Sequence, residues 1–149
     1  MNDDLARPSP NHVVLASQRL TYEPPDTVLW VIRGDLDGGE AAVAMDQFVD
    51  WSRGQPYMLF VVDVVELTAF SGEARKVLAS NGHRLPPRVL SFFGASFKVQ
   101  VLLDMMDRAT ALRGSKNRFT RHFPDEPSAR AWAAEMRPVL LEKAAAAVQ

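Results

Sequence analysis

A serine and a glycine stand where a predicted strand gives way to a predicted helix. The apolar run at residues 57–62 is typical of a strand buried on both faces, and Asp63 interrupts it. From Gly72 onward, apolar residues recur at helical spacing. Ser71 is therefore expected to cap this helix, with its hydroxyl accepting a hydrogen bond from a free backbone N–H of the first turn. A phosphoryl group on this serine would add about −1.5 to −2 charge beside those N–H groups.

Three acidic residues form the second set of chemically useful side chains. Asp35, Asp37 and Glu40 fall within six residues and could supply oxygen ligands to Mg²⁺ or Ca²⁺. The full spacing of a calcium-binding loop is absent, whereas Asp37 followed three residues later by Glu40 is typical of a capping box. We therefore expect these residues to begin a helix, and we expect neither a metal nor a cofactor.

Catalytic residue types are present without the spacing of a catalytic motif. Ser71, His83 and Asp63 include the side-chain types of a hydrolytic triad, yet no G-x-S-x-G turn surrounds the serine. The chain has no cysteine, which excludes thiolate catalysis and disulfides and fits a reducing compartment. The sequence therefore predicts a protein that is not an enzyme.

Length and composition predict one globular domain. The chain has 149 residues, of which 47% are hydrophobic, enough for a packed core. A formal net charge of −1 gives no overall field that would attract nucleic acid. No apolar run approaches the roughly 20 residues that span a bilayer, and the acidic N-terminus differs from a signal peptide. We expect a cytoplasmic protein with no nucleic-acid partner and no membrane span.

Hydrophobic periodicity predicts an α/β fold in which an N-terminal antiparallel hairpin precedes alternating strands and helices. The alternation implies parallel strand pairs with right-handed crossovers. About five strands are expected in a mixed sheet, at residues 12–20, 27–32, 57–63, 88–93 and 117–123. Four helices are expected, at 40–53, 72–84, 96–113 and from 127 onward, the last kinked or ended by Pro138. The single domain should span residues 11–143, between a flexible leader at 1–10 and a frayed tail at 144–149.

The same periodicity predicts which side chains face inward near the C-terminus. The buried stripe of the helix at 96–113 is expected to comprise Val101, Leu102, Met105, Ala109 and Leu112. In the strand at 117–123, alternation separates an aromatic face from a polar one: Phe119 and Phe123 against Arg118 and His122. Residues 108–122 contain no acid, so this segment could bind an anion, or its basic side chains could face solvent.

Several short motifs, in this order and spacing, resemble the STAS domain family, whose best-known members are bacterial anti-sigma-factor antagonists. The resemblance covers roughly residues 13–132 and is carried by Gly34-Asp-Leu-Asp37, Val61-Val-Asp63, Ser71-Gly72, Phe93-Gly-Ala-Ser96 and the segment Phe123–Trp132. Two features depart from the family pattern. Ala69-Phe70 stands where the family has Asp-Ser before its phosphorylatable serine, and the segment 63–71 is about two residues short. These departures resemble divergent STAS/Sec14-like bacterial proteins.

The resemblance implies a non-enzymatic regulatory module that a protein partner, such as an anti-sigma factor or serine kinase, reads at the helix start. It implies that Ser71 is the phosphorylatable position and that the partner contacts Phe70, Ser71, Gly72, Glu73, Arg75 and Asp37.

Several alternatives stay open. Ser71 could act only as a cap, and Phe70 could be an exposed anchor or could fold inward as a staple at the helix start. The Sec14-like relatives suggest a carrier of a small lipid or nucleotide, held between the sheet and the helix at 40–53 or 96–113. The carrier alternative requires a concave pocket there. Exposed edges at the first or fifth strand could also support a homodimer.

Overall fold

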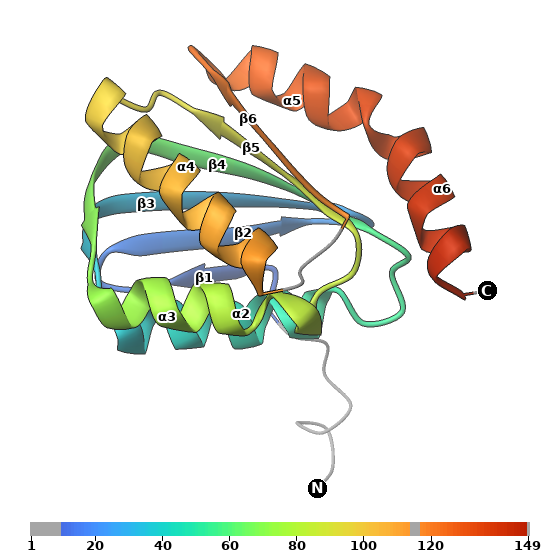
Figure 1. Ribbon diagram of the computed structural model, residues 1–149, viewed down its shortest axis with the longest axis horizontal. Helices are drawn as coiled ribbons and strands as arrows, with labels where there is room; N and C mark the ends of the chain where they lie inside the picture. Colours follow the sequence, from blue (N-terminus) through green and yellow to red (C-terminus); the bar gives the residue numbers. More distant parts are fainter. Residues whose placement is uncertain (1–9, 114–116, 149) are drawn as a thin grey trace, which may run out of the picture.

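The computed structural model describes residues 10–113 and 117–148, and it shows one mixed sheet with helices on both faces (Figure 1). The six strands lie side by side in chain order: β1 (His12–Val14), β2 (Gln18–Glu23), β3 (Thr27–Leu36), β4 (Met58–Phe70), β5 (Arg88–Phe93) and β6 (Arg118–Phe123). β1 to β3 pair antiparallel, and β3 to β6 pair parallel. The predicted α/β fold with its N-terminal hairpin is confirmed.

The helices of the described residues are α2 (Gly38–Trp51), α3 (Gly72–Ser80), α4 (Phe97–Leu112), α5 (Glu126–Glu135) and α6 (Arg137–Val148), with a short 3₁₀ helix, η1 (Gly82–Arg84). None of the helices in this part of the chain is long and apolar enough to cross a membrane. The C-terminal helix divides at Met136, so five α-helices replace the predicted four. Pro138 lies in the first turn of α6, where a proline is tolerated. α6 continues to Val148 through the segment predicted to be a frayed tail, while residues 1–9 of the predicted leader lie outside the described residues.

The segment predicted as one strand at 12–20 is two strands, which raises the strand count from five to six. A turn separates them, closed by a hydrogen bond from Leu15 N to Gln18 O at 2.8 Å. Glu40 of α2 holds this turn: Ser17 donates to it from its backbone N at 2.8 Å and from its hydroxyl at 2.6 Å. A polar turn fixed by a distant helix leaves little trace in local hydrophobicity, so the sequence does not indicate it.

The central strand is longer than its apolar run. β4 pairs with β5 only as far as Asp63, the residue at which the sequence predicts the strand to break. Beyond that point β4 continues to Phe70 and pairs with β3 alone, with irregular register near Gly34. The prediction that this strand ends at residue 63 is therefore wrong, because residues 64–70 continue β4. They form a two-stranded extension whose outer side chains, such as Val65, face solvent.

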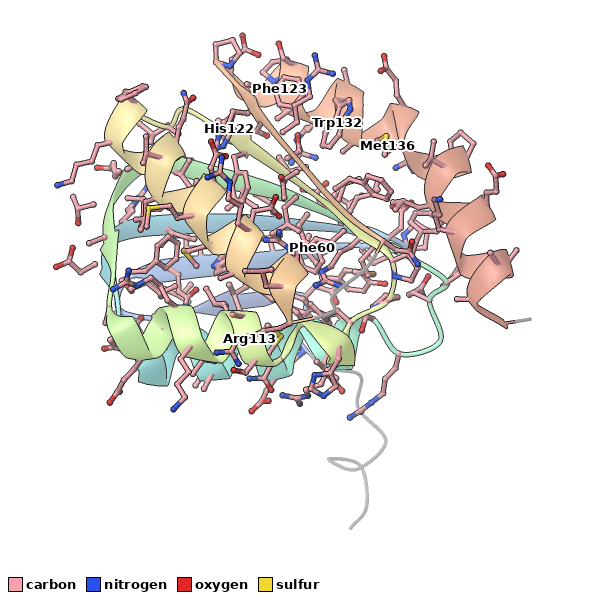
Figure 2. The ribbon with its side chains drawn as sticks, viewed as in Figure 1. Phe60, Arg113, His122, Phe123, Trp132 and Met136 are labelled. Carbon is pink, nitrogen blue, oxygen red and sulfur yellow. The ribbon has the colours of Figure 1, made fainter. Side chains whose placement is uncertain are left out.

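Each face of the sheet packs against its own helices. One hydrophobic cluster joins the α2, α3 and α4 side with strand residues that include Trp30 and Phe60. The other joins the α5 and α6 side through Leu59, Val89 and Leu140. Figure 2 shows Phe60 beneath the first group of helices, and Phe123 and Trp132 on the α5 side.

The alternation predicted for β6 is confirmed. Phe119 and Phe123 pack in the α5/α6 cluster. On the opposite face, His122 stacks on Phe92, with ring centroids 5.2 Å apart.

α4 is rotated relative to its predicted stripe. Its inner residues are Val99, Leu103 and Thr110, with Leu102 and Met106 partly buried. Val101, Met105 and Leu112, which were predicted to be buried, are 43%, 56% and 89% exposed.

Polar contacts with β6 account for this rotation. Asp107 of α4 pairs with Arg118, and Asp104 Oδ1 lies 3.2 Å from His122 Nε2. Residues 108–122 contain no acid in the sequence, but in the folded protein these two carboxylates lie beside basic side chains of that segment.

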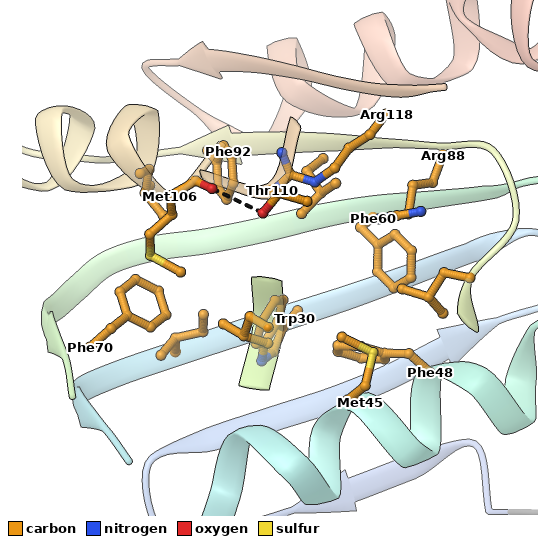
Figure 3. A pocket seen from close by; sticks show the side chains of 15 residues that line it. Trp30, Met45, Phe48, Phe60, Phe70, Arg88, Phe92, Met106, Thr110 and Arg118 are labelled. Carbon is orange, nitrogen blue, oxygen red and sulfur yellow. Dashed lines mark hydrogen bonds between the residues drawn. The ribbon is translucent and has the colours of Figure 1, made fainter. Parts of the chain in front are cut away.

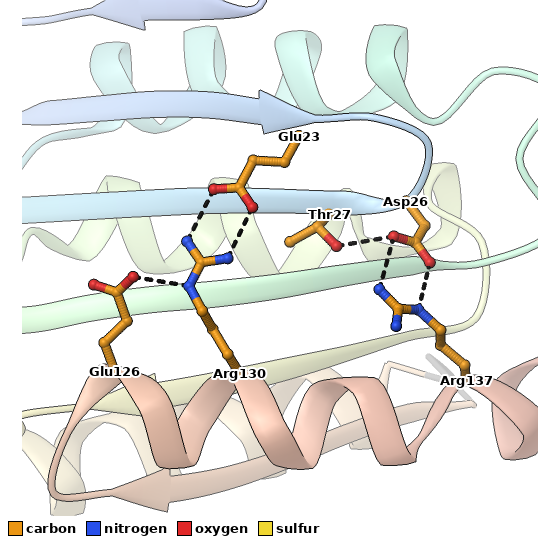
Figure 4. Close-up of polar contacts among 6 residues, drawn as sticks. All are labelled: Glu23, Asp26, Thr27, Glu126, Arg130 and Arg137. Atoms are coloured by element: carbon orange, nitrogen blue, oxygen red, sulfur yellow. Dashed lines mark hydrogen bonds and ion pairs between the residues drawn. The ribbon is translucent and has the colours of Figure 1, made fainter.

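Ion pairs fasten α5 and α6 to the turn between β2 and β3 (Figure 4). Arg130 of α5 donates two hydrogen bonds to Glu23, at 2.8 and 2.9 Å, and a third to Glu126 at 2.8 Å. The hydrogen bond from Arg130 holds the pKa of Glu23 below its ordinary value.

Asp26 is the buried member of the neighbouring pair. Its carboxylate accepts hydrogen bonds from Arg137 Nε at 2.8 Å, the Tyr57 hydroxyl at 2.7 Å and the Thr27 hydroxyl at 2.9 Å. Burial alone would raise the pKa of Asp26. The hydrogen bonds lower it by more than burial raises it, so the pKa lies below its ordinary value.

Candidate functional site

Two helices begin side by side at the carboxyl edge of the sheet. β3 ends at Leu36 and β4 ends at Phe70, and these two residues are register partners. The next residue of each segment, Asp37 or Ser71, is the N-cap of α2 or α3. Ser71 N donates to Leu36 O at 2.9 Å, which ties the two helix starts together. The carboxyl ends of parallel strands are the common location of binding sites in α/β folds.

Ser71 lies at the surface and caps α3 as predicted. Its Oγ accepts a hydrogen bond from Ala74 N at 3.0 Å, and its residue surface is exposed. The capping box predicted for α2 is confirmed only in part. Asp37 Oδ1 accepts from Glu40 N at 2.8 Å, but the Glu40 side chain binds Ser17 and leaves no reciprocal contact with the cap.

The first turns of α2 and α3 are in close contact. A Cβ added at Gly38 would lie 2.7 Å from Glu73 Cβ and 3.0 Å from Glu73 Oε2. Any larger residue at position 38 would therefore push the two helix starts apart. This close approach places the exposed side chains of Asp37 and Glu73 on one surface with Ser71.

Five of the six predicted contact residues share this surface and are exposed: Asp37, Ser71, Gly72, Glu73 and Arg75. We name them the cap surface. The sixth, Phe70, is only 6% exposed and belongs to the core cluster. The interpretation of Phe70 as an exposed partner anchor is therefore wrong: its side chain packs inward, as the staple alternative requires.

A cavity of about 60 Å³ lies on the same side of the sheet, between the strands and helices α2, α3 and α4 (Figure 3). Most of its lining is apolar, with Trp30, Phe60, Phe70 and Met106 among the walls. The carrier alternative requires a concave space at this location, and the cavity supplies a small one.

Two arginines, Arg88 and Arg118, also line the cavity and were not foreseen there. They are register partners on β5 and β6, so their side chains leave the sheet on the same face. Burial lowers the pKa of Arg88 to about 10, an effect that the charge of Arg118 increases, and burial lowers the pKa of Arg118 to about 10. The alternation of Arg88 with Leu90 and Phe92 along β5 is the signal that could have placed it inward.

Comparison with known proteins supports the fold. No protein-family model matches the chain, and no curated protein sequence matches it either. Among solved structures, it is similar to the anti-sigma factor antagonist SpoIIAA in its unphosphorylated form, with 10% sequence identity, a TM-score of 0.55, and coverage of 79% of this chain and 98% of that chain. It is also similar to an uncharacterized protein with a SpoIIAA-like fold from Shewanella loihica PV-4, with 15% identity, a TM-score of 0.55, and coverage of 84% and 97%. The chain therefore has a SpoIIAA-like fold, and the resemblance to STAS domains is confirmed at the level of the fold.

Proposed function

We propose that the chain is a regulatory module that binds a protein partner through the cap surface, and that phosphorylation of Ser71 weakens this binding. The observation that carries the proposal is an exposed serine that caps α3 at the carboxyl edge of a SpoIIAA-like fold. The solved relative SpoIIAA is an anti-sigma factor antagonist, so the expected partner is an anti-sigma factor or a serine kinase in the cytoplasm. The function requires binding and no catalytic step by this chain.

The local charges explain how a phosphate at Ser71 would act. The free N–H groups and dipole of α3 tolerate an anion at its first turn. Asp37 and Glu73 lie on the same surface, however, so a phosphate of about −1.5 to −2 charge would join two carboxylates there. A partner that packs against this surface would have to desolvate a much stronger negative charge after phosphorylation.

If Ser71 only caps α3, Ser71→Asp should leave partner binding unchanged, because a cap needs only a side-chain oxygen. Ser71→Asp retains a good cap residue and adds charge. Ser96 provides the matched control: it is exposed, it caps α4, and its Oγ accepts a hydrogen bond from Val99 N at 3.2 Å.

The test is quantitative co-purification from extracts of the native host, using wild type, Ser71→Asp and Ser96→Asp as baits. The proposal predicts a specific protein that is recovered equally with wild type and Ser96→Asp, and about ten-fold less, or about 1.4 kcal/mol weaker, with Ser71→Asp. Equal recovery with Ser71→Asp and wild type would show that Ser71 is a cap alone.

A further inference from the structure

The outer side of α4 carries an apolar stripe. Of the eight large apolar side chains that are exposed in the described part of the chain, four belong to this helix. Their spacing of four, four and seven residues places all of them on one side of it: Phe97, Val101, Met105 and Leu112. α4 crosses one face of the sheet (Figure 1), and its inner side packs there through Val99 and Leu103. The stripe is therefore not part of the core, although Phe97 is 82% exposed and Leu112 is 89% exposed.

The order of residues along the stripe is nearly symmetric about Met105. Phe97 and Leu112 lie eight and seven residues away from it. Val101 and the exposed Ala109 each lie four residues away. If two copies of this helix pack antiparallel about a two-fold axis at Met105, each apolar side chain of one copy opposes an apolar side chain of the other. A two-fold symmetric interface requires a self-complementary surface of this kind.

Two opposite charges beside the stripe have the same symmetry. Asp104 and Arg108 are one helical turn apart, and both are exposed. In the antiparallel arrangement, Asp104 of each copy lies opposite Arg108 of the other copy, which gives two contacts between opposite charges across the axis. The Asp104 carboxylate also contacts His122, but its side chain remains 60% exposed and accessible to a second copy.

Two further cations lie at the ends of α4 and limit the strength of this association. Lys98 is the second residue of the helix, and Arg113 is its C-cap. The antiparallel arrangement brings these ends near each other, and like charges oppose association. Arg113 is directed toward α3, however, where its Nη1 donates to Ser80 Oγ at 3.1 Å. One helix from each copy makes a small interface, so the expected dissociation constant is on the order of 10–100 µM.

We propose that the chain forms a homodimer in which the outer sides of two α4 helices pack antiparallel about a two-fold axis near Met105. The apolar stripe supplies the contact area, and the contacts between Asp104 and Arg108 set the direction of the helices. This interface uses neither edge of the sheet and none of the residues of the cap surface. The inference therefore goes beyond the proposed partner binding and does not depend on Ser71.

The test is sedimentation equilibrium of the intact protein over concentrations from about 1 µM to about 500 µM. Wild type is expected to change from monomer to dimer over this range. Met105→Glu places two carboxylates together at the axis and should weaken the dimer by at least about ten-fold. Val43→Glu is the matched control, because it introduces the same charge at an exposed valine of α2, and it should leave association unchanged.

Exchange of the two charges tests the direction of the helices. Asp104→Arg alone places arginines opposite each other, and Arg108→Asp alone places aspartates opposite each other. Each single change should therefore weaken the dimer by about ten-fold. The double variant that carries both changes restores opposite charges across the axis and should regain nearly the affinity of wild type.

Wild type that stays monomeric throughout the range would overturn the inference, and the stripe would then be a surface for a different protein or for lipid. Dimers that persist at full strength in Met105→Glu would place the interface elsewhere. A double charge variant that associates no better than the single variants would contradict the antiparallel arrangement. If Asp104→Arg does not fold because its contact with His122 is lost, Met105→Glu and Arg108→Asp decide the question, since both change exposed side chains.

Discussion

The two faces of the sheet hold their buried charges in different arrangements. On the α5 and α6 face, Asp26 and Arg137 form an ion pair in which the carboxylate also accepts from two hydroxyl groups. On the α2, α3 and α4 face, two arginines, Arg88 and Arg118, lie side by side next to a cavity, and Asp107 pairs with Arg118. The first arrangement attaches helices to the sheet, whereas the second brings two cations together beside a cavity.

This difference separates structural charges from charges that are candidates for function. Opposite charges that satisfy each other need no ligand to explain them. Buried charged groups with a shifted pKa are common at functional sites, and both arginines beside the cavity are of this kind. The cap surface and the cavity both include residues of α3. The helices of the other face, α5 and α6, pack in a separate hydrophobic cluster.

The largest expected effect compares one leucine from each face. Leu140→Ala removes a fully buried side chain from the closed α5/α6 cluster and should cost about 3–5 kcal/mol of the free energy of unfolding. Leu103→Ala removes a side chain that already borders the cavity and should cost only about 2 kcal/mol, since fewer contacts are lost. Urea denaturation measures both values, and equal losses would show that the two faces are equally well packed.

The second prediction concerns the ion pair between Asp26 and Arg137. Arg137→Met leaves a carboxylate that is 7% exposed without its cation and should cost about 2–3 kcal/mol at pH 7. Arg53→Met is the matched control, because Arg53 pairs with Asp50 at the surface and its side chain is 75% exposed. The control should change stability by less than about 0.5 kcal/mol. A similar loss in both variants would remove the distinction between buried and surface ion pairs.

Acidification should reduce the difference between wild type and Arg137→Met. The pKa of Asp26 lies below its ordinary value in the folded protein, so the folded state binds a proton there less readily than the unfolded chain. The stability that Asp26 contributes is fully present above the unfolded pKa of about 4 and is lost as pH falls through the lowered folded value. Unfolding curves at pH 7, 5, 4 and 3 should show the two proteins converging by about 1–2 kcal/mol at the acidic end. A constant difference across this range would contradict the assignment.

The smallest effect concerns the cap itself. Ser71→Ala should cost about 1 kcal/mol, and Ser96→Ala should cost a similar amount, because each removes one hydrogen bond at a helix start. Thermal unfolding of the two variants measures this. A much larger loss at Ser71 would show that the residue does more for the fold than capping, and that Ser71→Asp is an unsuitable probe of binding.

The features that sequence alone could predict are those with a local physical cause. Ser71 and Asp37 were assigned as helix caps because a side-chain oxygen before an apolar helical pattern has one common use. The faces of β6 followed from strict alternation. In both cases the sequence pattern that predicts the role of a residue lies within a few positions of that residue.

The features that sequence did not reveal depend on contacts between distant segments. The rotation of α4 is set by Asp104 and Asp107 meeting β6, and the turn before β2 is held by Glu40. Arg88 and Arg118 become neighbours in the lining of the cavity only when β5 and β6 pair. Phe70 turns inward because β4 continues past its apolar run to the end of β3.

The central claim, that phosphorylation of Ser71 controls partner binding, is tested most directly by phosphosite mapping of the chain recovered from native cells in two pools, one bound to its partner and one free. The account predicts that Ser71 carries phosphate in the free pool and is unmodified in the bound pool. Unmodified Ser71 in both pools, or the same phosphate occupancy in each, would contradict it.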